Sequence, residues 1–379
     1  MLFQHVFPEF RVESVDAVHA NNTRQKVRQN VMEMMKAAVL KDFSPRFEIE
    51  EVPKPVIEQP DDVIAKVLVC SICGTDVSLS TKPGSSYGDM VGRILGHEIV
   101  GEVTEVGPAV TSVKVGDRIV VNPNSYCNTC GPCRMGYRNH CKNMRLMGIT
   151  VPGGFAEYIK TQEFLAFPVK PEVPLDHAVF AEPLSCAMNG FSRLNIHPGE
   201  TCVVFGCGPI GLMFAQLARK SGARVVCVEP KDGRIAIAEK LGFTVLKPCA
   251  DLRDKLIELW GRRANFCIDA AGRQLPVAVD CAEFRGTILC FATSRLPEGG
   301  TLPNLGPIQG KELNIMGSFI IYDSMPRALA VIENECIDFD PIITHQLPLD
   351  RLADGIHYMQ TGEGMEIIIN IGRKMEELS

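Results

Sequence analysis

The chain has 379 residues, which is more than one hydrophobic core usually serves, so two domains are expected. Hydrophobic residues make up 46% of the chain and charged residues 22%, a composition typical of soluble globular proteins. The net charge of -6 at pH 7 argues against nonspecific binding to nucleic acid.

No targeting segment is recognisable at the start of the chain. Residues 1–34 contain four basic and four acidic side chains and no apolar signal core, whereas transit peptides are poor in acidic residues. We therefore predict an N-terminal extension over residues 1–34 and a cytoplasmic location. The longest uncharged stretch, residues 201–218, is interrupted by glycines and Gln216, which argues against a membrane span.

From residue 35 to about residue 161, short runs of β-forming residues follow one another, among them VIAKVLVCS, GHEIVGEVTEVG, GDRIVVN and FAEYIKT. They are bounded by Gly, Pro, Asn or Asp, which favour turns. This spacing predicts an irregular, barrel-like β domain.

Four cysteines of this region follow the spacing C-x2-C-x2-C-x7-C: Cys127, Cys130, Cys133 and Cys141. The chain has fifteen cysteines, an odd number, and no export signal, so a disulfide framework is not expected. Four thiolates are the ligands of a closed, structural zinc site. Basic residues around the cysteines also fit a zinc ribbon that binds nucleic acid, but they more simply offset the charge of the thiolates.

From about residue 198 the pattern changes to alternating strands and helices. TCVVF is typical of a buried strand, PIGLMFAQLARKSG of an amphipathic helix, RVVCVEP of a second strand and DGRIAIAEKLG of a second helix. The alternation predicts a doubly wound parallel sheet, and hence an α/β fold. After Leu313 the elements become shorter and mixed again, so the last residues are expected to rejoin the β domain.

The first strand and helix of this sheet are joined by GCGPIG, a G-x-G-x-x-G motif. Its glycines make a turn, let a pyrophosphate approach the backbone and let helix and strand pack. Glu229 can bind ribose hydroxyls and repel a 2′-phosphate, which favours NAD over NADP, whereas nearby Lys231 and Arg234 act against that preference. The predicted coenzyme contacts are Gly206, Gly208, Pro209, Ile210, Gly211, Glu229 and Arg234.

A thiol, an imidazole and two carboxyls stand in short motifs outside the glycine-rich unit: Cys73 in SICGTD, His97 and Glu98 in LGHE, and Glu182 in AEPLSC. Thiolate, imidazole and carboxylate with one open position are the composition of a catalytic zinc site. Each residue alone would be ordinary, but together with the four-cysteine lobe they indicate a metal-dependent enzyme.

The order GHE, four-cysteine lobe, EPLS and GxGxxG resembles the zinc-containing medium-chain dehydrogenase/reductases, and most closely their sorbitol, or polyol, dehydrogenase branch, over residues 35–372. The resemblance implies a GroES-like β-rich catalytic domain at residues 35–184. It further implies a Rossmann NAD-binding domain at residues 185–315 and a return to the catalytic domain at residues 316–379.

The resemblance also implies two zinc ions per chain, one structural and one catalytic. Cys73, His97 and Glu98 would hold the catalytic ion. Glu182 stands where alcohol dehydrogenases place a cysteine ligand, so either Glu98 or Glu182 could ligate directly. Thr75 matches the hydroxyl residue that bonds the substrate alcohol. Relatives of this kind pair through the last Rossmann strand, here residues 312–319, so a homodimer or homotetramer is expected.

Two positions depart from the family pattern. Ser78 follows CGTDV where a proton-relay histidine is common, and Ile320 and Ile321 replace an arginine and a tyrosine that hold the polyol. We therefore predict NAD-dependent oxidation of a secondary alcohol, namely a polyol, cyclitol or sugar acid, with sorbitol itself disfavoured. Two alternatives stay open: another alcohol class such as threonine or a short diol, and a non-enzymatic binding protein that kept the fold.

Overall fold

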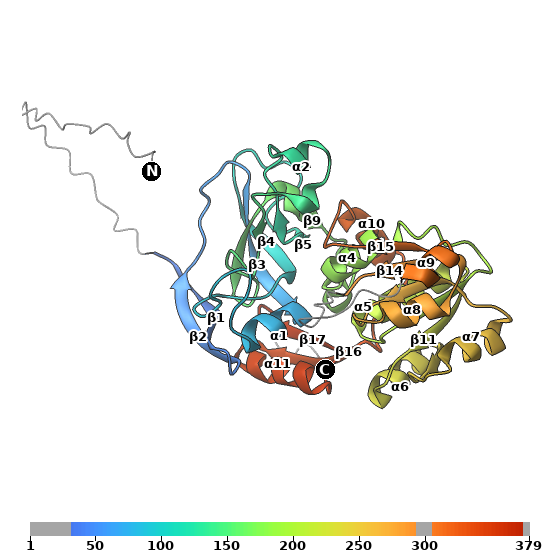
Figure 1. Ribbon diagram of the computed structural model, residues 1–379. Helices are drawn as coiled ribbons and strands as arrows, with labels where there is room; N and C mark the ends of the chain where they lie inside the picture. The colour runs from blue at the N-terminus through green and yellow to red at the C-terminus, as the bar shows by residue number, and fades with distance from the viewer. Residues whose placement is uncertain (1–31, 293–304, 374–379) are drawn as a thin grey trace, which may run out of the picture. The chain divides into compact units, whose positions relative to one another are not determined.

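The computed structural model describes residues 32–292 and 305–373, so the predicted extension lies outside the described residues except for its last three positions. The chain divides into two units, Met1–Glu33 and Met34–Ser379, and the architecture below belongs to the second. Two large sheets form this unit, one mostly antiparallel and one parallel (Figure 1).

The first sheet has seven strands in the order β16-β17-β3-β4-β5-β9, with β8 paired to β3 outside this path. Its pairings are antiparallel except that of β16 with β17. Two-stranded sheets β1-β2 and β6-β7 accompany it. The strands are β1 (Met34–Asp42), β2 (Arg46–Pro53), β3 (Asp62–Ser71), β4 (Glu98–Val106), β5 (Arg118–Val121), β6 (Asn124–Ser125), β7 (Arg145–Leu146), β8 (Tyr158–Gln162), β9 (Ala166–Pro168), β16 (Ile343–Pro348) and β17 (Glu366–Asn370).

Alternation along β3 explains how this sheet buries its apolar face. Val63, Ala65 and Val67 point the same way because side chains alternate along a strand. They enter a core that also takes Leu79 of α1 and Ile356 of α11. Figure 1 shows these two helices side by side. The helical segments that accompany the sheet are α1 (Gly74–Thr81), α2 (Gly131–Arg134), η1 (Arg138–His140), η2 (Glu163–Leu165), α3 (Leu175–Ala178), η3 (Leu349–Arg351) and α11 (Leu352–Thr361).

The second sheet has six strands in the order β12-β11-β10-β13-β14-β15, and all of its pairings are parallel. This confirms the predicted doubly wound sheet. Its strands are β10 (Thr201–Phe205), β11 (Arg224–Val228), β12 (Thr244–Leu246), β13 (Ala264–Asp269), β14 (Ala282–Cys290) and β15 (Asn314–Gly317). The helices are α4 (Ala181–Phe191), α5 (Pro209–Lys220), α6 (Asp232–Lys240), α7 (Leu252–Trp260), α8 (Leu275–Cys281), α9 (Leu305–Gly310) and α10 (Met325–Glu333).

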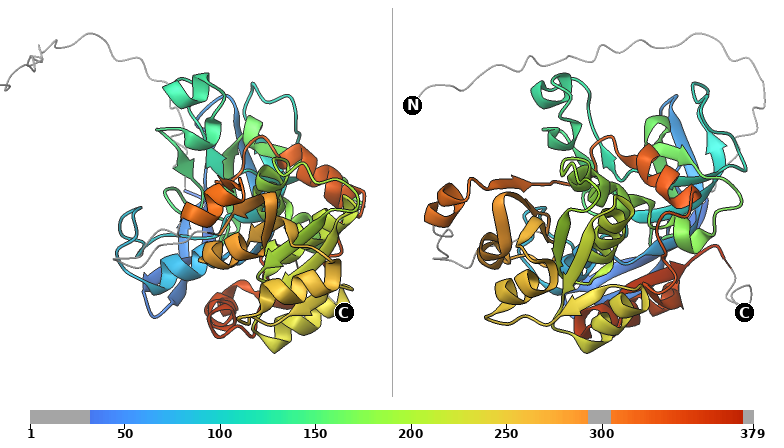
Figure 2. Two further views of the ribbon diagram at one scale, coloured as in Figure 1. Left: turned by 45° about the vertical axis from the view of Figure 1, so that its right-hand side comes forward. Right: turned by 90° about the vertical axis from the view of Figure 1, so that its right-hand side faces the viewer.

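Helices cover both faces of the parallel sheet (Figure 2). Val204 of β10 belongs to a core that contains Leu212 of α5. Its neighbour Val203 belongs to a second core with Leu256 of α7 and Ala278 of α8. Because successive strand residues face opposite sides, the uninterrupted apolar run TCVVF is what a strand buried on both faces requires.

The chain returns to the first sheet after it has completed the second. β17 pairs with β3 in antiparallel register, with Ile368 opposite Ser71. The domain limits given above stay predictions. No helix within residues 32–292 and 305–373 is long and apolar enough to cross a membrane.

Candidate active site

The antiparallel pairing of β3 with β4 brings the thiol and imidazole motifs together. Ser71, the last residue of β3, lies opposite Glu98, the first residue of β4. Cys73 follows as the N-cap of α1, and His97 directly precedes β4. One donor atom each of Cys73, His97 and Glu98 lies within 4.8 Å of the others. The predicted catalytic set therefore forms a compact cluster.

Asp76 organises this cluster, although the sequence analysis did not single it out. Its side chain is fully buried in the first turn of α1. One carboxylate oxygen accepts the Cys73 backbone N–H at 3.0 Å, and the other accepts the Gly96 N–H at 3.1 Å. The second oxygen also lies 3.5 Å from His97 Nδ1. A carboxylate behind a histidine fixes the orientation of the ring toward a metal.

Burial makes the cluster a poor place for negative charge without a cation. Desolvation raises the pKa of Glu98 to about 7 and that of the Cys73 thiol to about 11. For His97 burial lowers the pKa, but nearby Asp76 and Cys73 outweigh burial and raise it well above its usual value. A divalent ion would offset the charges of the thiolate and the carboxylate, so these residues fit Zn(II).

Glu182 lies near the cluster on α4 and is buried. Burial raises the pKa of its carboxyl, and the Cys186 thiol donates a hydrogen bond to Glu182 Oε1 at 3.4 Å. Among the described residues, the compact set of donor atoms consists of Cys73, His97 and Glu98 and does not include a Glu182 oxygen. Cys186 had no distinguishing pattern in the sequence beyond its place one helical turn after Glu182.

Thr75 stands two residues after Cys73, in the first turn of α1, and its side chain is half-buried. Ser78 follows at a distance of three residues on the same helix and is exposed. Residues three apart on a helix are neighbours on its surface. Thr75 and Ser78 thus lie on one side of α1.

The four predicted structural ligands also come together. Cys127, Cys130, Cys133 and Cys141 have their sulfur atoms within 4.8 Å of one another. Cys141 Sγ lies 3.6 Å from Cys127 Sγ and 3.9 Å from Cys130 Sγ. Tetrahedral zinc with Zn–S bonds of about 2.3 Å requires sulfur atoms about 3.8 Å apart. The lobe therefore fits a structural zinc ion.

The thiols of the lobe differ in acidity. Hydrogen bonds from the Thr129 side chain and backbone lower the pKa of Cys127 to about 5. Burial raises the pKa of Cys133 to about 12. The lowered pKa favours the thiolate form of Cys127, whereas zinc binding would have to displace a proton from Cys133.

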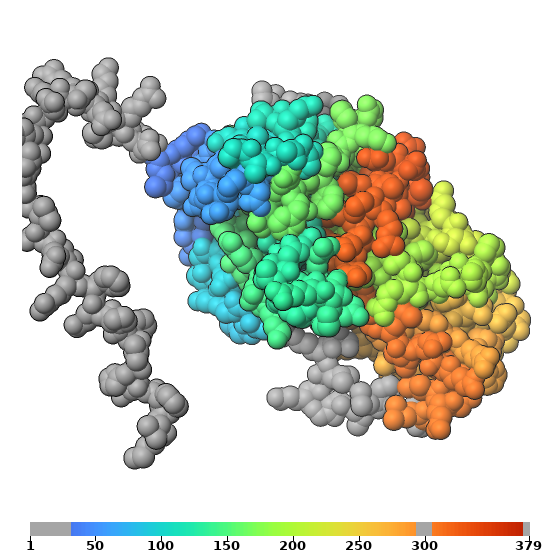
Figure 3. Space-filling view, turned by 90° about the horizontal axis from the view of Figure 1, so that it is seen from above, coloured from blue at the N-terminus to red at the C-terminus, as the bar shows by residue number. Residues whose placement is uncertain are grey.

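The lobe is bonded to the segment that links β15 to α10, residues 318–323. Arg138 Nη1 lies 3.4 Å from both oxygens of Asp323, and Asn139 donates to the Phe319 carbonyl at 3.1 Å. The rings of His140 and Phe319 are stacked with centroids 5.6 Å apart. Figure 3 shows the lobe next to the orange surface that contains this segment.

Ile320 in this segment has a φ of 42°, a left-handed conformation that is costly for a β-branched residue. Asn189 of α4 donates to the carbonyls of both Phe319 and Ile320, at 3.1 and 2.8 Å. Because Asn189 is buried, these hydrogen bonds hold the strained turn from the side opposite the solvent.

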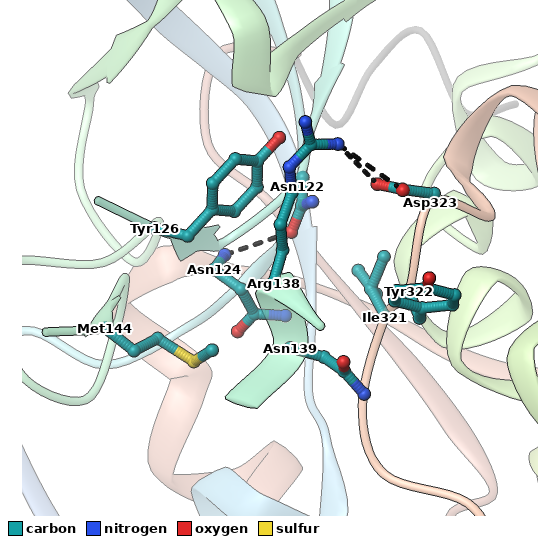
Figure 4. A pocket seen from close by; sticks show the side chains of 9 residues that line it. All are labelled: Asn122, Asn124, Tyr126, Arg138, Asn139, Met144, Ile321, Tyr322 and Asp323. Atoms are coloured by element: carbon teal, nitrogen blue, oxygen red, sulfur yellow. Dashed lines mark hydrogen bonds and ion pairs between the residues drawn. The ribbon is translucent and has the colours of Figure 1, made fainter. Parts of the chain in front are cut away.

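Two cavities adjoin the lobe. One, of about 10 Å³, lies between polar side chains and Ile321 (Figure 4), with Arg138 stacked on the Tyr126 ring at 5.2 Å. It has room for about one water molecule rather than a substrate. The other, of about 520 Å³, lies between the lobe, α4 and residues 317–322, within the size range of ligand sites. Neither cavity is lined by Cys73, His97 or Glu98.

The glycine-rich motif joins β10 to α5 as predicted. Gly206 has a φ of 97°, Gly208 is the N-cap of α5 and Pro209 its first residue, followed by Ile210. A Cβ at Gly211 would lie 1.9 Å from the carbonyl oxygen of Gly206, so no other residue fits there. The helix N-terminus therefore presents free N–H groups to an approaching anion.

Glu229 is bonded within this loop. Its side chain is buried, with Oε2 accepting the Cys207 N–H at 2.8 Å and Oε1 accepting the Lys231 N–H at 3.0 Å. Arg234 approaches the same loop, because its Nη1 lies 3.7 Å from where a Cβ of Gly208 would stand. The Nε of Arg234 is buried without a hydrogen-bond partner. A carboxylate and a guanidinium thus face the same loop.

Residues 59–171 match the family "Alcohol dehydrogenase GroES-like domain" and residues 209–334 match "Zinc-binding dehydrogenase". D-arabinitol dehydrogenase 1 of Uromyces fabae is 30% identical over 85% of this chain and 93% of its own length. The chain belongs to the zinc-binding alcohol dehydrogenase family. The predicted family, the GroES-like and Rossmann fold and the class of oxidoreductase are confirmed.

Two other relatives of this family bear on the substrate and the coenzyme. L-threonine 3-dehydrogenase of Bacillus velezensis is 29% identical, covering 88% of this chain and 98% of its own. A crystal structure of a zinc-binding dehydrogenase from Sinorhizobium meliloti, bound to NADP, is 30% identical with a TM-score of 0.80, covering 89% of this chain and 99% of that one.

Metal analysis tests the two clusters separately. The purified protein should contain about two zinc ions per chain. Cys130→Ser should lose one ion and lower the melting temperature, because structural zinc contributes folding free energy directly. Cys73→Ala should lose the other ion with a smaller change in stability. A single ion that disappears in Cys73→Ala would refute the two-site assignment.

The close approach at Gly211 generates a second prediction. Gly211→Ala should remove measurable binding of the coenzyme and lower the melting temperature, because its methyl group overlaps the Gly206 carbonyl. Gly233→Ala is the matched control: this glycine lies in α6 with open space around it, so alanine should raise stability by about 0.5–1 kcal/mol. Equal effects of the two changes, measured by thermal unfolding and coenzyme titration, would contradict the assigned role of Gly211.

Proposed function

We propose that the enzyme reversibly oxidises a secondary alcohol, namely a polyol, cyclitol or sugar acid, to a ketone with NAD as acceptor. The observation that carries this proposal is the compact set of Cys73, His97 and Glu98 in a chain that also has the coenzyme loop. The threonine 3-dehydrogenase relative supports an amino alcohol as the second candidate, whereas Ser78 in place of a relay histidine counts against it. The fifteen free cysteines support a reducing, cytoplasmic location.

The residues of the cluster have separate roles in this reaction. Cys73, His97 and Glu98 would hold zinc, while Asp76 keeps the His97 ring in place. When bound, zinc would supply the Lewis acidity that lowers the pKa of the alcohol, and NAD would supply the hydride acceptor. Thr75, in the first turn of α1, would take the hydroxyl proton and pass it outward past the exposed Ser78.

The expected substrate preference rests on Ile320 and Ile321, which stand where relatives carry the arginine and tyrosine that hold a polyol; of these two, Ile321 is described by its packing. Its side chain is buried and belongs to the apolar core, so it offers no hydrogen bond to a hydroxyl. The polar groups beside it enclose space for about one water and are partly used by one another. A substrate that needs fewer hydrogen bonds at the end away from the reacting carbon, such as a ring polyol or a short diol, fits these residues better than a long open-chain polyol.

A comparison of substrates tests this proposal. We expect kcat/KM, read as NADH absorbance, to be higher for a cyclitol such as myo-inositol or for a short vicinal diol than for sorbitol. Each unpaired hydroxyl buried against isoleucine would cost about 1–3 kcal/mol. If sorbitol is clearly best, the assignment of Ile320 and Ile321 is wrong. If no alcohol is oxidised by protein with both zinc ions, a binding protein that kept the fold is the better description.

The coenzyme preference depends on Glu229. Its carboxylate should disfavour a 2′-phosphate, so kcat/KM should favour NAD over NADP by about tenfold, or about 1.4 kcal/mol. Glu229→Ser should reduce that ratio, and Lys231→Ala should increase it. Equal rates with both coenzymes in the unmodified enzyme would show that Lys231 and Arg234 dominate. The related structure from Sinorhizobium meliloti holds NADP, which makes this ratio informative.

We expect a homodimer or homotetramer that pairs through β15. This strand ends the six-stranded sheet, and its Ile315 side chain is 39% exposed. An apolar strand at a sheet edge invites pairing with another chain. Ile315→Lys should shift the mass measured by light scattering toward that of one chain. Val277→Lys on α8 is the matched control: the native Val277 is also 39% exposed, and its replacement should leave the mass unchanged. An unmodified enzyme with the mass of one 41.6 kDa chain would contradict this assembly.

A further inference from the structure

Three neighbouring strands of the first sheet carry a row of buried oxygen atoms behind the metal cluster. Ser71 of β3 lies opposite Glu98 of β4 on one side and opposite Ile368 of β17 on the other. Residues that lie opposite each other in an antiparallel pair point to the same face of a sheet. Glu366, two residues before Ile368, points to that face as well. Glu98, Ser71 and Glu366 therefore form one row across β4, β3 and β17.

This row is shielded from water. Ser71 is fully buried, Glu98 is 3% exposed and Glu366 is 4% exposed. Ser71 Oγ donates a hydrogen bond to Glu98 Oε2, and Glu366 lies on the same face of the neighbouring strand β17. The second oxygen of Glu366, Oε1, is buried without a hydrogen-bond partner. Nothing in the role proposed for Glu98 explains why a second carboxyl is buried two strands away.

The number of protons in the row fixes the direction of its hydrogen bonds. A serine hydroxyl donates one hydrogen bond and accepts others. Because the Ser71 proton goes to Glu98, the Ser71 oxygen is left as an acceptor that a protonated Glu366 could donate to. A donor that bonds the hydroxyl polarises it and strengthens its own bond to the next acceptor. The arrangement therefore restrains the Glu98 carboxylate from behind, while Asp76 restrains His97.

We propose that Glu366 and Ser71 are positioning residues that aim the Glu98 carboxylate at the catalytic metal. This inference rests on the proposed zinc-dependent function. Ser71 and Glu366 are held by the ladder of one sheet, whereas Glu182 is on α4 and, among the described residues, receives a single hydrogen bond, from the Cys186 thiol. Outer partners of this kind typically change metal affinity by about 10–100-fold.

The test measures zinc affinity at the catalytic cluster by competition with a chelator, in the full chain, with the zinc of the four-cysteine lobe as an internal control. Ser71→Ala removes only the hydroxyl, and Glu366→Met removes the donor at similar volume. Both should weaken zinc binding at the catalytic cluster by about 10–100-fold and leave the lobe zinc in place. Glu366→Gln keeps a donor of the same shape and should restore most of the affinity.

Cobalt(II) bound at the catalytic cluster provides a second measurement, which a change in protein stability alone would not alter. Its visible spectrum should change in Ser71→Ala and Glu366→Met and stay close to that of the unmodified enzyme in Glu366→Gln. Asn370→Ala, a change at a buried polar residue on the same face of β17, should leave the spectrum and the zinc affinity unchanged. If Glu366→Met fails to fold, Ser71→Ala and Glu366→Gln still decide the question.

Unchanged zinc affinity and an unchanged cobalt spectrum in Ser71→Ala would overturn the proposal. Indistinguishable behaviour of Glu366→Gln and Glu366→Met would also overturn it, because a merely structural carboxyl would not require a donor. Neither the zinc affinity nor the cobalt spectrum requires the protein to turn over a substrate. A chain that binds zinc at both clusters but oxidises no alcohol would thus refute the proposed function without deciding this inference, which the affinities settle separately.

Discussion

The register of β3 against β4 is the constraint on which the candidate site depends. It places the end of one strand opposite the start of the next, with Ser71 facing Glu98, and the chain on either side supplies Cys73 and His97. A slip of one residue would turn Glu98 toward the other face of the sheet. The buried apolar residues of β3 resist such a slip, since it would expose them. Packing of the β-rich core and the chemistry of the cluster are therefore fixed by the same pairing.

Much of this arrangement could be predicted because it is encoded in short, local patterns. The four cysteines lie in one loop, and GCGPIG lies between a strand and a helix, so spacing alone indicates their geometry. Asp76 could have been identified by the same reasoning, because an acidic side chain three residues after an N-cap commonly accepts a hydrogen bond from the backbone N–H of the cap residue.

The parts that could not be predicted depend on contacts between distant segments. Nothing near Glu366 indicates that β17 would lie beside β3, and without that pairing the residue is simply an acidic position at the start of an apolar strand. The left-handed conformation of Ile320 is similarly hidden, because a β-branched residue is among the least expected there. The sequence identified Ile320 and Ile321 as unusual, but only the structure shows Asn189 and Asn139 holding the backbone around them.

The position of β17 has a consequence for how the protein reaches its native state. The six-stranded sheet and its helices are contiguous in the chain, so they can form as soon as their own residues are available. The first sheet must wait, because β3 obtains one of its central neighbours only from a strand that follows the whole parallel sheet. Closing so long a loop is slow, and until it closes the end of β3 at residues 69–71 lacks its partner strand. The pairing of β3 with β4 is local in the chain and can bring Cys73, His97 and Glu98 together early, whereas Glu366 joins them only when β17 has paired with β3.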